Sequence, residues 1–126
     1  MAERKAKVLV VEDDVDTSDN IKARLQKEGY DTLTCYDGLR ALEMIRHESP
    51  DVVVLDIMIP GVPGHHICRL LKFDERFQNL PIIVVTGRSD TEYRQMAEKA
   101  GASRFLRKPF EMSQLLEAVA AAVGGA

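Results

Sequence analysis

Stretches of continuous apolar residues alternate along the chain with stretches in which apolar residues recur at helical spacing. Three stretches, at residues 7–11, 51–56 and 81–86, are rich in β-branched residues and contain few polar side chains, as in strands buried on both faces of a sheet. Two shorter strands are predicted at 32–36 and, after the breaker Gly101, at 102–106. The segments that follow the strands carry apolar residues at i, i+3 and i+4, which predicts helices packed on the sheet. Their apolar positions are Ile21/Leu25, Ala41/Leu42/Ile45, Ile67/Leu70/Leu71, Met96/Ala97 and Leu115/Leu116/Val119.

Five repeats of strand then helix predict an α/β fold, a doubly wound (βα)5 domain. A parallel sheet with right-handed crossovers and helices on both faces satisfies that alternation. The 126 residues are an ordinary length for one domain and leave no room for a second, so we expect residues 1–126 to form a single domain.

Charge and composition narrow the class of function. Seventeen basic and twenty acidic residues give a net charge of −3, which does not resemble a nucleic-acid footprint, and we expect no direct nucleic-acid binding. The apolar runs are too short to span a bilayer, and the acids at 12–14 interrupt the first run in a way that a secretory signal does not tolerate. We therefore expect a cytoplasmic protein without membrane attachment, in which Cys35 and Cys68 are free thiols.

Polar residues stand where the predicted strands end. The first strand stops at the acids 12–14, the second long run at Asp56, the third at Thr86, and the last strand just before Lys108. In an open parallel sheet these ends meet at one edge, where ligands bind. Clustered carboxylates repel unless a cation lies among them, and hard oxygen ligands suit Mg²⁺. Lys108 and Thr86 would then complete a pocket for a doubly charged anion, with Asp56 as the nucleophile that forms an acyl-phosphate.

The same positions carry a family resemblance. The motifs VLVVEDD at 8–14, VVVLDIMIPG at 52–61, IIVVTG at 82–87 and FLRKPF at 105–110 resemble the response-regulator receiver domain of two-component signalling, of the CheY-like kind. The resemblance covers essentially the whole chain. It implies a flavodoxin-like sheet with strand order 2-1-3-4-5 and a module that catalyses only its own phosphorylation and dephosphorylation, rather than an enzyme with a separate substrate.

The resemblance also implies individual roles. Asp56 would accept a phosphoryl group from a histidine kinase or a phosphotransfer protein, in a reaction that needs Mg²⁺. Asp13 would bind the metal directly, Glu12 would support it, and Met58 would contribute its backbone carbonyl. Thr86 and Lys108 would hold phosphoryl oxygens.

Phosphorylation would change a partner-binding surface. The resemblance places that surface on the strand at 102–106 and the helices around 96–97 and 115–119, with Thr86 and Phe105 as the switch residues. Phe105 lacks the hydroxyl of the commoner Tyr, so its signal would rest on packing alone.

The residues at three further positions predict how long the phosphoryl group lasts. Met58 and Arg88 stand two positions after Asp56 and Thr86, where side chains border the approach of the hydrolytic water. Met58 is apolar and Arg88 is long and cationic, so we expect both to screen the phosphoryl group and slow its hydrolysis. Gly87, where Ala is commoner in the family, is expected to loosen the loop after the third long strand.

Two other functions remain open. A small phosphohydrolase could use an aspartyl-phosphate, with Asp14 and Asp16 as an Asp-x-Asp motif, although the chain has no residues left for a substrate-selecting cap. A pseudo-receiver could act as a constitutive interaction module, although its usual sign, the loss of a phosphorylation residue, is absent. Asp16 and Asp19 are better explained as helix-capping residues than as calcium ligands.

The oligomeric state is predicted from positions that pair acids with bases in dimeric relatives. Here those positions are Ser103, Arg104, Gln114, Ala118 and Ala120, and the pairing is missing. We expect a monomer or a weak, phosphorylation-dependent dimer, and Ala118, Ala120 and Ala121 could present small residues to a partner helix.

Overall fold

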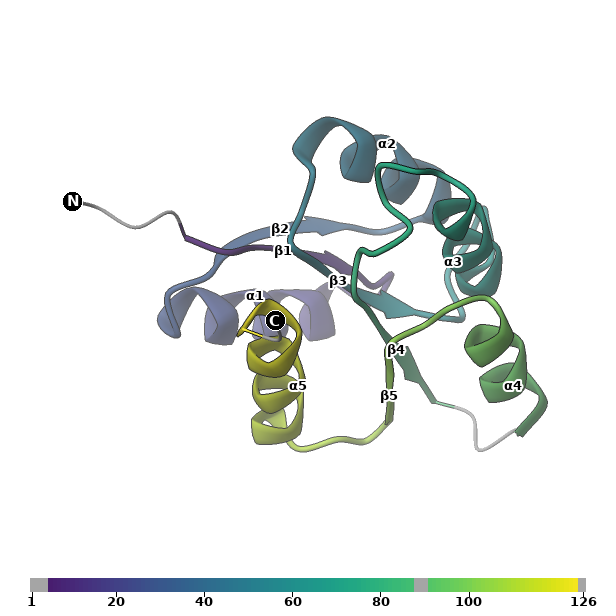
Figure 1. Ribbon diagram of the computed structural model, residues 1–126. Coiled ribbons are helices and arrows are strands. Elements are labelled where there is room, and N and C mark those ends of the chain that lie inside the picture. The colour runs from purple at the N-terminus through teal and green to yellow at the C-terminus, as the bar shows by residue number, and fades with distance from the viewer. Residues whose placement is uncertain (1–4, 88–90, 125–126) are drawn as a thin grey trace.

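The computed structural model describes residues 5–87 and 91–124, in which five strands alternate with five helices (Figure 1). All strand pairs are parallel, and the order is β2-β1-β3-β4-β5. Both the doubly wound fold and this strand order confirm the prediction. The elements are β1 (Lys7–Val11), α1 (Val15–Lys27), β2 (Asp31–Cys35), α2 (Gly38–Glu48), β3 (Val52–Asp56), α3 (Gly64–Lys72), β4 (Ile82–Thr86), α4 (Thr91–Lys99), β5 (Arg104–Arg107) and α5 (Met112–Gly124).

The sheet separates two apolar cores, because alternate side chains of a strand point to opposite faces. Leu9, Val53 and Val84 point to the face covered by α2, α3 and α4, whereas Val10 and Val54 point to the face covered by α1 and α5. Figure 1 shows these two helical layers on either side of the strands. The central strand β3 lies between β1 and β4, and all five of its residues are buried.

Glycines hold the loop after β3 against its neighbours. The amide of Gly38 donates to the carbonyl of Pro60 at 3.0 Å, and the amide of Gly64 donates to the carbonyl of Ile57 at 3.3 Å. A Cβ at Gly64 would lie 2.7 Å from the Ile57 Cα and 3.1 Å from the Asp56 carbonyl oxygen. The first turn of α3 can therefore approach the end of β3 this closely only with glycine at position 64.

Two predictions about individual helices are wrong. Helix α1 begins at Val15 with Asp14 as its N-cap, because the amide of Ser18 already donates to the Asp14 carbonyl at 2.9 Å. Asp16 and Asp19 therefore lie inside the helix and do not cap it. On α5, Ala118 is buried against the sheet, so it cannot join Ala120 and Ala121 in a surface patch.

Both thiols are free and buried, as expected, and burial raises the pKa of Cys35 to about 11 and that of Cys68 to about 12. Among the described residues, none of the helices has the length and apolar character needed to cross a membrane.

Candidate functional site

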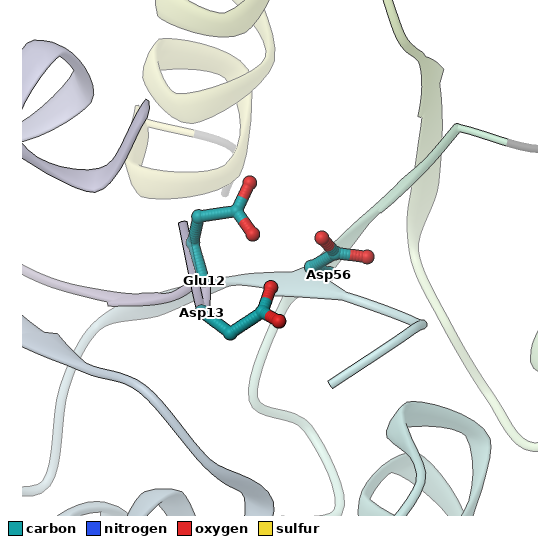
Figure 2. Close-up of side chains that lie close together, drawn as sticks. All are labelled: Glu12, Asp13 and Asp56. Atoms are coloured by element: carbon teal, nitrogen blue, oxygen red, sulfur yellow. The ribbon is translucent and has the colours of Figure 1, made fainter. Parts of the chain in front are cut away.

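Acidic side chains from the ends of β1 and β3 converge at the carboxyl edge of the sheet. Glu12 and Asp13 directly follow β1, and Asp56 is the last residue of β3. Figure 2 shows the three carboxyl groups gathered around one space. Glu12 and Asp56 are buried, whereas Asp13 is exposed. The parallel pairing of β1 with β3 produces this arrangement, because it brings Val11 opposite Leu55 and so places the acids that follow near one another.

Lys108 supplies the positive charge within this group. Its backbone amide donates to the Thr86 carbonyl at 2.8 Å, which continues the pairing of β4 with β5 and brings the side chain to the same edge. The ammonium group forms ion pairs with the carboxylates of Glu12 and Asp56, and its Nζ lies 3.0 Å from Asp56 Oδ2. The other oxygen, Asp56 Oδ1, accepts a hydrogen bond of 2.9 Å from the amide of Met58. Asp56 is therefore fixed through both of its carboxylate oxygens.

Burial and neighbouring charges perturb the titration of two of these groups. Burial, followed by the hydrogen bond with Asp56, raises the pKa of Glu12 from 4.5 to about 7, even though Lys108 acts in the opposite direction. Burial alone would lower the pKa of Lys108, but its hydrogen bonds to Glu12 and Asp56 outweigh burial and raise it. Lys108 is therefore charged at neutral pH, and Glu12 holds a proton more tightly than an exposed glutamate does.

The three carboxyl groups fit a divalent cation. Glu12, Asp13 and Asp56 each offer an oxygen, and these oxygens lie within 4.8 Å of one another. Hard oxygen donors of this kind suit Mg²⁺, which is commonly held by one or two carboxylates together with water and phosphate oxygens. Asp13 is the exposed member of the group, so the group is in contact with solvent on its side.

The remaining predicted residues lie around this group or near it. Thr86 ends β4 and is buried at the carboxyl edge. Met58, whose amide contacts Asp56, is 44% exposed. No described residue outside its chain neighbours lies within 4 Å of the position that a Cβ on Gly87 would take. Arg88, the other residue predicted to control hydrolysis, lies outside the described residues.

Phe105, the predicted aromatic switch, lies in the middle of β5 and is partly buried against the core. The guanidinium carbon of Arg94 on α4 lies 5.2 Å from the centre of its ring, within the range of a cation–π contact. The sequence analysis did not identify Arg94. No signal in the sequence could have found it, because it meets Phe105 only through the packing of α4 against the sheet.

Sequence reasoning also missed two contacts of the site. It assigned Glu12 only to the metal, whereas the structure pairs Glu12 with Lys108. It predicted that the backbone carbonyl of Met58 binds the metal, but it did not foresee that the backbone amide of Met58 donates a hydrogen bond to Asp56. The convergence of strand ends was predictable, but the distribution of hydrogen bonds among the converged groups was not.

Comparison with known proteins identifies similar chains. Residues 8–120 match the family model described as the response regulator receiver domain. A curated relative, the DNA-binding response regulator MtrA of Mycolicibacterium paratuberculosis, is 35% identical over 93% of this chain. The match covers 51% of that relative, so the chain spans about half the length of the curated relatives it matches.

Solved structures agree with this match. The chemotaxis response regulator CheY4 of Vibrio cholerae has a TM-score of 0.88 at 28% identity, covering 94% of this chain and 99% of its own. The receiver domain of a sensor histidine kinase from Pseudomonas aeruginosa, which holds a magnesium ion in its active-site cleft, has a TM-score of 0.88 at 26% identity. That comparison covers 96% of this chain and 99% of the other.

Proposed function

The chain belongs to the response regulator receiver domain family, and from that premise we propose that Asp56 is its phosphoacceptor in a Mg²⁺-dependent reaction. A histidine kinase or a phosphotransfer protein is the proposed donor. The observation that supports this assignment is the position of Asp56, buried at the end of the central strand, with Lys108 on one carboxylate oxygen and the Met58 amide on the other. Of the three clustered acids, Asp56 alone contacts both.

The proposed step is a phosphoryl transfer. An oxygen of the Asp56 carboxylate forms a bond to phosphorus while the bond from phosphorus to the donor histidine nitrogen breaks, and the bonding electron pair leaves with that nitrogen. The Lys108 ammonium, already within hydrogen-bond distance of Asp56, offsets the negative charge brought by the phosphoryl group. Thr86, at the end of the adjacent strand, is the proposed hydroxyl donor to a phosphoryl oxygen.

The proposed metal ligands are Asp13 and Asp56, with Glu12 in support and the Met58 carbonyl as a further ligand. When bound, Mg²⁺ would neutralise charge on the transferring phosphoryl group and bring it into line with the acceptor. The carboxyl cluster and the magnesium ion in the Pseudomonas aeruginosa relative support this assignment.

Phosphorylation is proposed to change the surface formed by α4, β5 and α5, with Thr86 and Phe105 as the residues that respond. The partly buried ring of Phe105 supports a change in packing there. A downstream protein is the proposed partner. MtrA binds DNA, but about half of its length has no counterpart in this chain, so the absence of direct nucleic-acid binding stays a prediction. A cytoplasmic location and a monomer or weak dimer also stay predictions.

Acetyl phosphate provides the direct test. Intact-mass spectrometry of the chain with acetyl phosphate and Mg²⁺ should show the addition of one phosphoryl group, and the addition should be lost with EDTA. Asp56→Asn should remove it. Asp14→Asn is the matched control, because Asp14 lies at the same edge outside the cluster and Asn is an equally good N-cap. Phosphorylation of Asp56→Asn at the wild-type rate would refute the assignment.

The same experiment separates the two other functions. A phosphohydrolase of the Asp-x-Asp type would lose activity with Asp14→Asn, and a pseudo-receiver would acquire no phosphoryl group with any donor. The measured decay of the phosphorylated chain then tests the lifetime prediction. Met58→Asn and Arg88→Glu should each accelerate decay, and unchanged decay in both variants would exclude these side chains as barriers to water.

A further inference from the structure

A groove of about 450 Å³ lies between the ends of α3 and α4, away from the phosphorylation site. Figure 1 shows these two helices as neighbours on the face of the sheet opposite α1 and α5. Each helix runs back antiparallel to the strands, so the last turns of α3 and α4 lie at the amino edge of the sheet, opposite Asp56. The groove, called here the α3–α4 groove, is lined by Arg69, Lys72, Phe73, Lys99 and Ala100.

The groove carries positive charge that the described chain does not neutralise. Arg69, Lys72 and Lys99 form no ion pair with any described residue. Two acids that are near these cations in the sequence pair with other residues, Asp74 with Arg76 at 3.1 Å and Glu98 with Arg94 at 3.5 Å, and no acid is among the residues that line the groove. Basic residues are favoured in last turns by the helix dipole, but two helix ends together contribute only about one negative charge. Most of the charge of three cations is left over.

Gly101, just after α4, leaves room for the Lys72 side chain. A Cβ at Gly101 would lie 2.9 Å from Lys72 Cδ and 3.4 Å from Lys72 Nζ, so the Lys72 stem crosses directly over Gly101. Gly101 also has a φ of +97°, which glycine adopts readily and other residues do not. Lys72 therefore extends from α3 toward the turn after α4, where Lys99 ends its helix.

Apolar surface borders the cations. Phe73, the C-cap of α3, is 81% exposed, and Leu70 one turn earlier is also exposed. An isolated exposed apolar residue is ordinary, but here Phe73 lines the groove beside cations that pair with no described residue, and Leu70 lies one helical turn away. This combination matches a ligand that carries both negative charge and apolar side chains.

We propose that the α3–α4 groove binds a segment of a partner protein in which acidic and apolar residues are interspersed. Charge complementarity identifies the acidic residues as ligands of Lys72 and Lys99, and the exposed ring of Phe73 identifies the apolar component. A nucleic acid fits less well. Its affinity depends on neutralising many phosphates, and this chain offers three clustered cations on a molecule of net charge −3. The groove adds a docking surface whose occupancy does not require phosphorylation of Asp56.

Fluorescence anisotropy with the full chain tests the proposal. The probe is a fluorescein-labelled synthetic peptide in which glutamates alternate with leucines. Lys72→Glu and Lys99→Glu should each weaken its binding about tenfold, because each reversal replaces an attraction with a repulsion. Phe73→Ala should also weaken binding, and at high salt as well as low salt, because its contribution is apolar. All three variants should still accept the phosphoryl group from acetyl phosphate.

Lys27→Glu is the matched control. Lys27 is an exposed lysine in the last turn of α1, so its reversal has the same helix-dipole cost and the same effect on net charge, on the opposite face of the sheet. It should leave peptide binding unchanged.

Four results would overturn the proposal. They are the absence of saturable peptide binding, equal weakening by Lys27→Glu, stronger binding of a labelled single-stranded oligonucleotide than of the peptide, and a dimer in sedimentation experiments that Lys99→Glu dissociates. The last two would assign the groove to nucleic acid or to a second copy of the chain.

Discussion

Replacing Gly64 by alanine should destabilise the protein, because it forces the first turn of α3 away from the end of β3. The new methyl group would lie 2.7 Å from the Ile57 Cα and 3.1 Å from the Asp56 carbonyl oxygen. Both are backbone atoms, so no side chain can rotate away, and the start of α3 must retreat from the end of β3. Overpacking of this kind costs about 1–3 kcal/mol, against which alanine gains about 0.4–1 kcal/mol by restricting the unfolded chain. The net loss of stability should therefore be about 1–2 kcal/mol.

Gly87→Ala is the comparison that isolates this effect. It makes the same chemical change at the same edge of the sheet, but within the described ranges nothing apart from its chain neighbours lies within 4 Å of its Cβ position. Its stability should stay unchanged or rise by about 0.5 kcal/mol, because only the unfolded chain is affected. Urea denaturation followed by circular dichroism measures both variants, and the slope of the transition should stay the same if the loss is one of stability alone.

The position of α3 also bears on the phosphorylation site. Retreat of α3 shifts the loop that carries Met58, whose amide holds Asp56 at 2.9 Å. Phosphorylation of Gly64→Ala by acetyl phosphate should therefore be slower than that of the wild-type chain. If Gly64→Ala were as stable as Gly87→Ala, the close approach of α3 to β3 would not constrain the fold, and the reasoning would be refuted.

Three other perturbations have defined outcomes. Lys108→Met should lower the free energy of unfolding by about 1–3 kcal/mol at neutral pH, which is less than for a fully buried pair because the Lys108 side chain is 30% exposed. Mg²⁺ should restore part of the lost stability. Denaturation curves of this variant that do not respond to Mg²⁺ would argue against a cation site. In EDTA, the wild-type chain should lose stability relative to Glu12→Gln as the pH rises from 4.5 to about 7. The Glu12 carboxyl releases its proton near pH 4.5 in the unfolded chain but only near pH 7 in the folded chain, so deprotonation in this range favours unfolding. Denaturant titrations across this range measure the difference, and parallel pH curves would contradict it. Cys68, whose pKa burial raises to about 12, should react with iodoacetamide at neutral pH only when the chain unfolds, and peptide mass analysis showing rapid modification of the native chain would contradict its burial.

The sequence predicted the architecture well because apolar runs and helical periodicity are direct consequences of a buried parallel sheet. The strand at 32–36 begins one residue earlier, at Asp31, and the strand at 102–106 is shifted to Arg104–Arg107. Strand ends are less predictable because Ala102 and Ser103 have no strong preference that separates a turn from a strand. Four acids between 12 and 16 likewise gave no basis for choosing Asp14 over Asp16 as the cap.

The candidate site was predictable as a set of residues, since parallel strands must bring their carboxyl ends together. Its internal hydrogen bonds were not, because Lys108 can reach either Glu12 or Asp56 and only the packed backbone determines that it reaches both. The α3–α4 groove was entirely outside the reach of sequence reasoning. Its lysines belong to helices separated by β4, and each lysine alone looks like an ordinary last-turn cation.

The burial of all five residues of β3 determines where this molecule can respond to a reaction at Asp56. A strand enclosed by neighbours on both sides exchanges its amide hydrogens last, since exchange there requires the sheet to open. The reacting carboxylate is therefore anchored to the part of the chain that opens least. The edge strand β5 has no buried residue and pairs on one side only within the described sheet. A displacement after phosphorylation should therefore appear as faster exchange of the backbone amide hydrogens of β5. The amide hydrogens of β3 should remain protected and can serve as an internal reference.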